Sequence, residues 1–162
     1  MLLSRGVITL INSSTKLQSV QMHFLDDGVK DGLEYFEPYG FTATAPANNR
    51  EGLALFFDGD RGHGVVICIA NRQYRLRGLQ PGEVALYDDQ GQKIVLSKTG
   101  IHITSPDSIR LEAPIVHCTG YFLCQGEVID RAEKGGISMS KTRDIYNAHT
   151  HSDHHVPTQS VM

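Results

Sequence analysis

The chain has 162 residues, with 15 Lys and Arg against 18 Asp and Glu, so its formal charge is −3. This length suffices for one domain or two small modules with a sizeable core. No apolar run reaches the roughly 20 residues of a membrane-spanning helix, and the first residues lack a signal-peptide pattern. The acidic balance argues against strong binding of nucleic acid. Three widely spaced cysteines, without a Cys-x-x-Cys pair, argue against a disulfide framework and for synthesis in a reducing compartment.

The first 80 residues show the period-two alternation of apolar side chains that is typical of β-strands. Turn-forming clusters such as Asn12-Ser13-Ser14 separate the apolar stretches. Five short strands without a convincing helix predict a small closed barrel or a sandwich. The predicted strands are residues 6–11, 16–25, 33–36, 53–57 and 64–70.

After residue 80 the predicted strands become shorter and more evenly spaced. Only a few turn residues connect one strand to the next, which indicates a ladder-like or solenoid arrangement. The predicted strands are residues 83–87, 93–97, 101–104, 108–112, 115–119 and 121–124.

This ladder lacks a cover for its apolar side chains. Ile94 and Leu96 share one face, and Ile101 and Ile103 share another, but no second sheet or helix is predicted to pack on them. An obligate oligomer that wraps several copies around one axis would bury these faces. The alternative is one continuous β-sandwich that the ladder forms with the N-terminal strands.

Four histidines lie close together near the C-terminus: His149, His151, His154 and His155. In an extended segment, residues i and i+2 project from the same face, so His149 and His151 can offer two imidazoles to one metal ion. Two ligands do not complete a site, since zinc normally takes four and octahedral metals take six.

Three arrangements could complete the site. Asp153, His154 or His155 could fold back within the chain, or distant residues such as His63 or His102 could approach. In the third arrangement, a threefold axis passes through the site and a trimer supplies six imidazoles. The alternative to all three is a solvated polar tail that binds no metal.

The surroundings of the His-x-His pair argue against an enzyme. Only 11 residues follow His151, too few for the barrel of a metal-dependent hydrolase. No Glu follows the pair as a cupin requires, and the chain has no nucleophile elbow, phosphate-binding loop or His-Glu-x-x-His motif. A soluble β-sandwich binding module or a cupin-like metalloenzyme that uses the histidine cluster is the second hypothesis.

Two stretches resemble a known family. Residues 60–67 (DRGHGVVI), with Tyr74-Arg75 and residues 79–87 (LQPGEVALY), resemble the Mu-like phage baseplate spike proteins. Residues 143–151 (RDIYNAHTH) resemble the apex segment of the baseplate assembly protein V family of contractile tails. Both stretches occur in the family's order.

The resemblance implies an all-β fold formed by an intertwined homotrimer. It places an OB-type (oligonucleotide/oligosaccharide-binding) barrel in residues 1–80, a triple-stranded β-helix in residues 81–138 and a metal-capped apex in residues 139–162. At the apex, His149 and His151 of each chain would bind one iron ion per trimer on the threefold axis, or another divalent metal. His154 and His155 would be a second ligand set or simply exposed polar residues.

The resemblance also implies a mechanical function without catalysis. The protein would be the central spike of a contractile tail baseplate and would pierce the host outer membrane when the sheath contracts. Its partners would be two further copies of itself, other hub proteins of the baseplate and, transiently, the host outer membrane, with no nucleic acid among them. It would be made in the host cytoplasm and located in the virion.

Overall fold

The computed structural model describes residues 2–25, 28–57, 60 and 62–150. The chain divides into two compact units at Arg110 and Leu111, and each is described by itself. No helix in the described part of the chain is long and apolar enough to cross a membrane.

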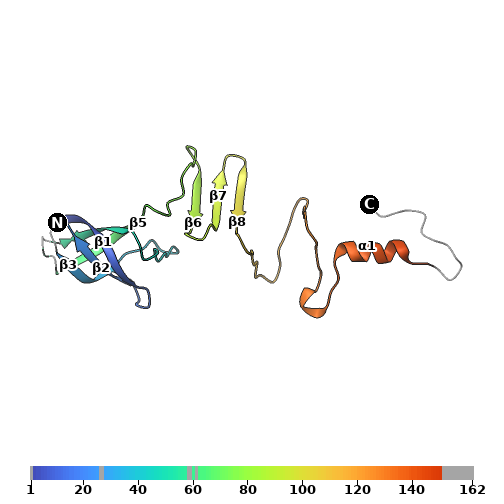
Figure 1. Ribbon diagram of the computed structural model, residues 1–162, viewed down its shortest axis with the longest axis horizontal. Coiled ribbons are helices and arrows are strands. Elements are labelled where there is room, and N and C mark those ends of the chain that lie inside the picture. Colours follow the sequence, from blue (N-terminus) through green and yellow to red (C-terminus); the bar gives the residue numbers. More distant parts are fainter. Residues whose placement is uncertain (1, 26–27, 58–59, 61, 151–162) are drawn as a thin grey trace. The chain divides into compact units, whose positions relative to one another are not determined.

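The first unit begins with a closed barrel of five strands, in the order β1-β2-β3-β5-β4. β1 pairs with both β2 and β4, which closes the barrel, and β3 and β5 form a parallel pair. This confirms the predicted barrel, which is of the five-stranded OB type (Figure 1). The strands are β1 (Leu2–Asn12), β2 (Gln18–Phe24), β3 (Val29–Tyr35), β4 (Arg50–Phe56) and β5 (Gly64–Asn71).

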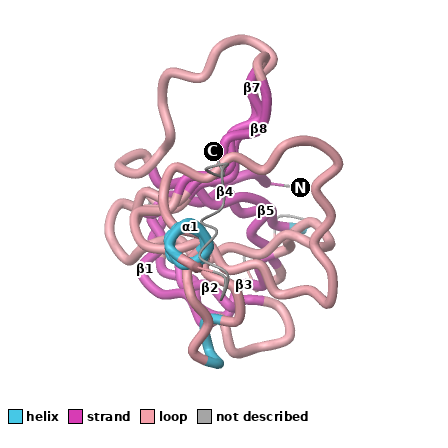
Figure 2. The backbone as a smooth tube through the Cα atoms, turned by 90° about the vertical axis from the view of Figure 1, so that its right-hand side faces the viewer, coloured by secondary structure: helices cyan, strands magenta, loops and turns pink. Residues whose placement is uncertain are grey.

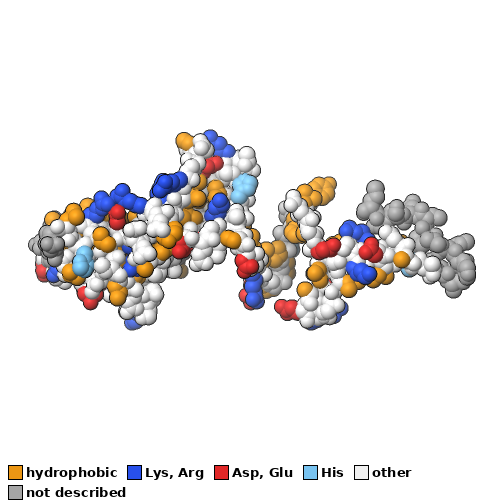
Figure 3. Space-filling model, in the orientation of Figure 1, with side chains coloured by type: hydrophobic (Ala, Val, Ile, Leu, Met, Phe, Trp, Pro, Cys, Tyr) orange, Lys and Arg blue, Asp and Glu red, His pale blue; other side chains and the backbone are white. Residues whose placement is uncertain are grey.

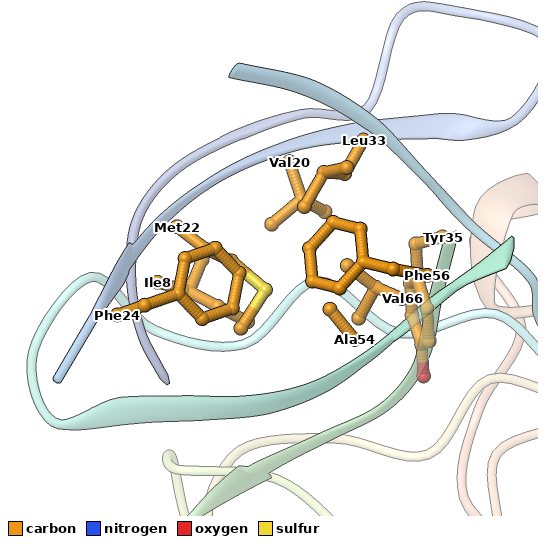
Figure 4. Packing of buried hydrophobic residues seen from close by; sticks show 9 residues of the cluster. All are labelled: Ile8, Val20, Met22, Phe24, Leu33, Tyr35, Ala54, Phe56 and Val66. Carbon is orange, nitrogen blue, oxygen red and sulfur yellow. The ribbon is translucent and has the colours of Figure 1, made fainter. Parts of the chain in front are cut away.

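The barrel core follows directly from the alternation in the sequence. Along β4, every second residue from Arg50 to Phe56 is buried, and the residues between them are only partly covered. The rings of Phe24 and Phe56 meet edge to face, with centroids 5.6 Å apart, in the middle of the cluster (Figure 4). The buried apolar side chains are Ile8, Val20, Met22, Phe24, Leu33, Tyr35, Ala54, Phe56 and Val66.

Two polar side chains close one end of the barrel. The Gln18 amide donates to the Ala43 carbonyl at 3.2 Å and accepts from the Thr44 hydroxyl at 3.0 Å. Nη2 of Arg50 donates to the Thr9 carbonyl at 2.8 Å, beside the irregularity in the pairing of β1 with β2. Because a buried polar group is costly without a partner, these bonds let the barrel end in polar residues.

A separate three-stranded sheet follows the barrel, so one continuous sandwich is not what this chain forms. Its strands are β6 (Val84–Tyr87), β7 (Lys93–Ser97) and β8 (Gly100–Thr104), which confirms three predicted strands (Figure 1). The register aligns aliphatic residues in two rows on one face, which we call the apolar sheet face. Its rows are Leu86, Ile94 and Ile103, and Val84, Leu96 and Ile101.

The strands predicted at 108–112, 115–119 and 121–124 are not formed by the chain on its own. These residues have the composition of strands, but a strand needs a neighbour for its backbone hydrogen bonds, and this chain offers none there. Figure 2 draws this stretch as loop.

The chain is mostly β, as expected, but it also contains a short helical part. A 3₁₀ turn, η2 (Ala132–Lys134), and one helix, α1 (Met139–Ala148), follow in the second unit. The sequence predicted no helix in this stretch, and the extended backbone expected for the His-x-His pair begins only after the helix, at His149. It has no glycine or proline to break it, and it ends at the residue before His149.

Gly64 offers a test of the barrel packing. A Cβ at this position would lie 2.4 Å from Cδ1 of Phe56, a ring that is fully buried. We expect Gly64→Ala to lower the stability of the barrel by about 1–3 kcal/mol, the usual cost of overpacking, measured by thermal unfolding. In Gly120→Ala, the control, the added Cβ meets nothing within 4 Å. Equal unfolding midpoints for the two variants would contradict this packing.

Candidate metal centre at the C-terminal end

His149 lies at the C-terminal end of α1, where the backbone leaves the helix. Its φ of −68° and ψ of 145° are extended, as the sequence analysis assumed for the His-x-His pair. Its Nδ1 contacts the Tyr146 carbonyl oxygen, and its ring lies against the Tyr146 ring at 5.0 Å. Because a carbonyl can only accept, a hydrogen bond at this contact requires the proton on Nδ1. Such a bond would leave Nε2 as the nitrogen that is available to a metal.

The other predicted ligand, His151, lies outside the described residues, as do Asp153, His154 and His155. His63 and His102 belong to the first unit. The His63 ring lies against Phe57 at 5.1 Å, and His102 pairs with Val95 in the sheet. Within residues 2–25, 28–57, 60 and 62–150, no three His, Cys, Asp or Glu side chains are grouped closely enough to hold a metal. The ligand pair therefore stays a prediction.

The helix before His149 begins with a side-chain cap. The Ser138 hydroxyl accepts from the backbone N–H of Lys141 at 3.2 Å. The Ser138 carbonyl accepts from the backbone N–H of Thr142 at 2.9 Å. A Ser cap of this kind typically stabilises a helix by about 1 kcal/mol, because it satisfies an N–H that has no partner within the helix. Ser138 thus fixes where the helix starts.

A carboxylate from earlier in the chain holds this cap in place. The Ser140 hydroxyl lies 2.6 and 2.7 Å from the two carboxylate oxygens of Glu127, and 2.9 Å from the Ser138 hydroxyl. The backbone supports the same contact, because the Met139 N–H donates to the Val128 carbonyl at 2.8 Å. We call Glu127, Ser138 and Ser140 the helix latch.

The latch depends on a tight reversal of the chain between Ile129 and Ser138, which form an isolated bridge. Gly135 has a φ of 72°, and Arg131 adopts the same left-handed region at 50°. A Cβ on Gly136 would lie 1.6 Å from the Asp130 carbonyl oxygen, so only glycine fits there. The Gly-Gly pair is a turn signal that the sequence offers. The contact of Glu127 with Ser140 was not predicted, because no sequence pattern links these two residues.

The hydrogen bonds of the latch also act on its ionisation. The Ser140 hydroxyl, and after it the Ser138 hydroxyl, hold the pKa of the Glu127 carboxyl below its ordinary value of 4.5, and the positive charge of Arg143 acts in the same direction. Both hydroxyls favour the ionised carboxylate because they donate to it. The latch is therefore formed by the charged state of Glu127.

This pKa predicts an acid-sensitive helix end. Because the folded pKa is lowered, the contribution of the latch is fully present above 4.5 and is lost as the pH falls through the lowered value. Hydrogen exchange should show the protection of the Lys141 and Thr142 amides falling over that range. Glu127→Gln should weaken the protection at neutral pH and remove its acid dependence. Glu133→Gln, which removes a nearby carboxylate outside the latch, should behave like the unmodified chain; an identical loss in both variants would contradict the latch.

Comparison with known proteins identifies the barrel. Residues 5–73 match the family described as Bacteriophage Mu Gp45, N-terminal. The "Baseplate puncturing device gp45" of Escherichia phage Mu is 28% identical over 128 residues. The "Mu-like prophage FluMu protein gp45" of Haemophilus influenzae is 27% identical over 119 residues. Each match covers 74% of this chain and 64% of the relative, so the chain spans less than two thirds of the length of these relatives.

Proposed function

Because residues 5–73 match the Mu Gp45 family and the chain is similar to Mu-like baseplate proteins, as its motifs predicted, we propose that it is the trimeric central spike of a contractile tail baseplate. Its location is the tail baseplate of the virion. The spike would be driven through the host outer membrane on sheath contraction, with the barrels joined to other hub proteins. It would act mechanically, without catalysis and without binding nucleic acid.

The observation that carries this proposal is the distribution of buried residues. Among the residues that the structure describes, every buried apolar side chain lies between Ile8 and Val66, and none from 81 to 150 is buried. Large apolar residues there are open to solvent, among them Ile101 at 68%, Ile115 at 69% and Leu123 at 89%. Figure 3 shows such apolar side chains at the surface. Burying one of them fully is worth about 1.5–3 kcal/mol, so the chain gains much from a partner.

The sequence pattern favours two further copies of the chain as the partners that bury these exposed apolar side chains. β6 and β8 are the edges of a three-stranded sheet, and edges with free backbone groups readily pair with another chain. The strands predicted between 108 and 124 lack neighbours in the single chain. In a triple-stranded β-helix, strands of three chains would supply each other's backbone partners and enclose the apolar sheet face.

The metal would serve the same mechanical purpose. Chain ends normally fray, and a metal bound by His149 and His151 of three chains would tie the ends together and add its binding energy to the folded trimer. The contact of His149 Nδ1 with the Tyr146 carbonyl suits this use, because it leaves Nε2 as the ligating atom. Six imidazole nitrogens suit iron, and other divalent metals accept them too.

The oligomeric state tests the proposal most directly. Size-exclusion chromatography with light scattering should give three times the chain mass of 17.9 kDa. The trimer should resist dilution, because the apolar surface of residues 81–150 is buried only on assembly. A stable monomer would reject the spike and favour the second hypothesis, a soluble binding module or metalloenzyme.

Elemental analysis tests the metal site separately. We expect one metal ion per three chains, and its loss in acid near and below pH ~6.5, where free imidazole becomes protonated. His149→Ala with His151→Ala should remove the metal but leave the trimer assembled, because the apolar ladder contributes most of the burial. The matched control is His102→Ala, which removes an imidazole from the exposed strand β8. Metal content that persists in the double variant would reject histidine ligation.

A further inference from the structure

A groove lies where the barrel meets β6 in the first unit, with a volume of about 600 Å³. Four aromatic residues line it, three of them at the barrel end and one at the end of β6. They are Tyr35, Phe41, Tyr74 and Tyr87. Phe41 and Tyr87 are 49% and 45% exposed, so their rings are open to an incoming group.

The charged lining of the groove is acidic. Asp88 and Asp89 lie at its rim, and no Lys or Arg lines it. Asp88 is already committed to its turn, because its Oδ1 accepts from the backbone N–H groups of Gln90 and Gln92 at 2.9 Å. Asp89 has no ion pair among the described residues. Aromatic faces next to a carboxylate are the surroundings that a guanidinium prefers, since it stacks on the rings and pairs with the acid.

The chain carries matching cations in the segment between the barrel and β6. Arg75 and Arg77 are exposed, and neither forms an ion pair in the described structure. Neither of them lines the groove of its own chain. Arg72, in the same segment, differs from both because it pairs with Glu51 at 3.0 Å.

We propose that the groove receives the Arg75–Arg77 segment of a second copy, so that its guanidinium groups stack on the exposed rings and pair with Asp89. This contact rests on the proposed trimer and adds to it what we call the neck latch, which lies where the barrel is followed by the first strand of the ladder. A head-to-tail contact of this kind closes into a ring when three copies are related by a threefold axis.

Charge reversal tests the contact in the full chain. Arg75→Glu with Arg77→Glu, and separately Asp89→Arg, should each lower the thermal midpoint of the trimer by several degrees. Combining all three substitutions in one chain should restore most of that loss. The difference from the unmodified protein should shrink in 1 M NaCl, where the Debye length falls to about 3 Å. Lys98→Glu, which changes the charge by as much as one of the Arg→Glu substitutions but in an exposed turn of the same sheet, is the control and should have no such effect.

Mixed trimers distinguish a contact between chains from one within a chain. The variant with Arg75→Glu and Arg77→Glu can be co-expressed with the Asp89→Arg variant. In a mixed trimer, the introduced glutamates of one chain then face the introduced arginine of a neighbouring chain. Mixed trimers should therefore be more stable than either variant alone, which a contact within one chain does not allow.

Each failure has a distinct meaning. A monomeric unmodified protein overturns the proposed spike and this contact together. An unmodified trimer whose charge-reversed variants melt unchanged, or are not restored by the triple combination, overturns only the neck latch. A basic segment of another baseplate protein in the groove would give that second result, since the trimer would not depend on Asp89.

Discussion

The constraint on which the rest of the structure depends is that the core buried among the described residues lies entirely within residues 8–66. The barrel closes on itself through the pairing of β1 with β4, and its interior holds all of the described apolar side chains that are buried. Beyond the barrel, the apolar sheet face and the residues after Thr104 are rich in large apolar side chains. No second layer of the described chain packs on these side chains, so they stay exposed. In the proposed trimer, assembly would be part of folding for the second half.

The two halves accordingly use different sources of stability. The barrel has edge-to-face packing of Phe24 and Phe56 and, at one end, hydrogen bonds from Gln18 and Arg50 to backbone carbonyls. The second half, taken alone, is held by local hydrogen bonds such as those of the helix latch. Such local hydrogen bonds set the path of the backbone but bury little apolar surface. They therefore leave that surface open to the partner chains of the proposed trimer.

The helix latch also explains how a short helix can precede the histidine pair. A ten-residue helix with no buried residue is marginal by itself in water. The Ser138 cap and the Glu127 carboxylate hold its first turn, and the last turn places His149 with Nδ1 against the Tyr146 carbonyl. The position of the histidine ring is therefore set by contacts at both ends of the helix.

The sequence by itself determined the strands of the barrel and of the small sheet, because the period-two alternation of apolar and polar residues indicates which side chains face inward. It also determined the family resemblance and the histidine pair as the candidate ligands. Only the tertiary structure decided that the barrel closes with β1 against β4, that residues 139–148 form the helix α1, and that Glu127 reaches Ser140. These features depend on contacts between residues far apart in the chain or on local capping bonds, and neither leaves a periodic pattern. The strands predicted beyond residue 104 are absent for the opposite reason: the pattern is present, but the described chain offers these residues no neighbouring strand.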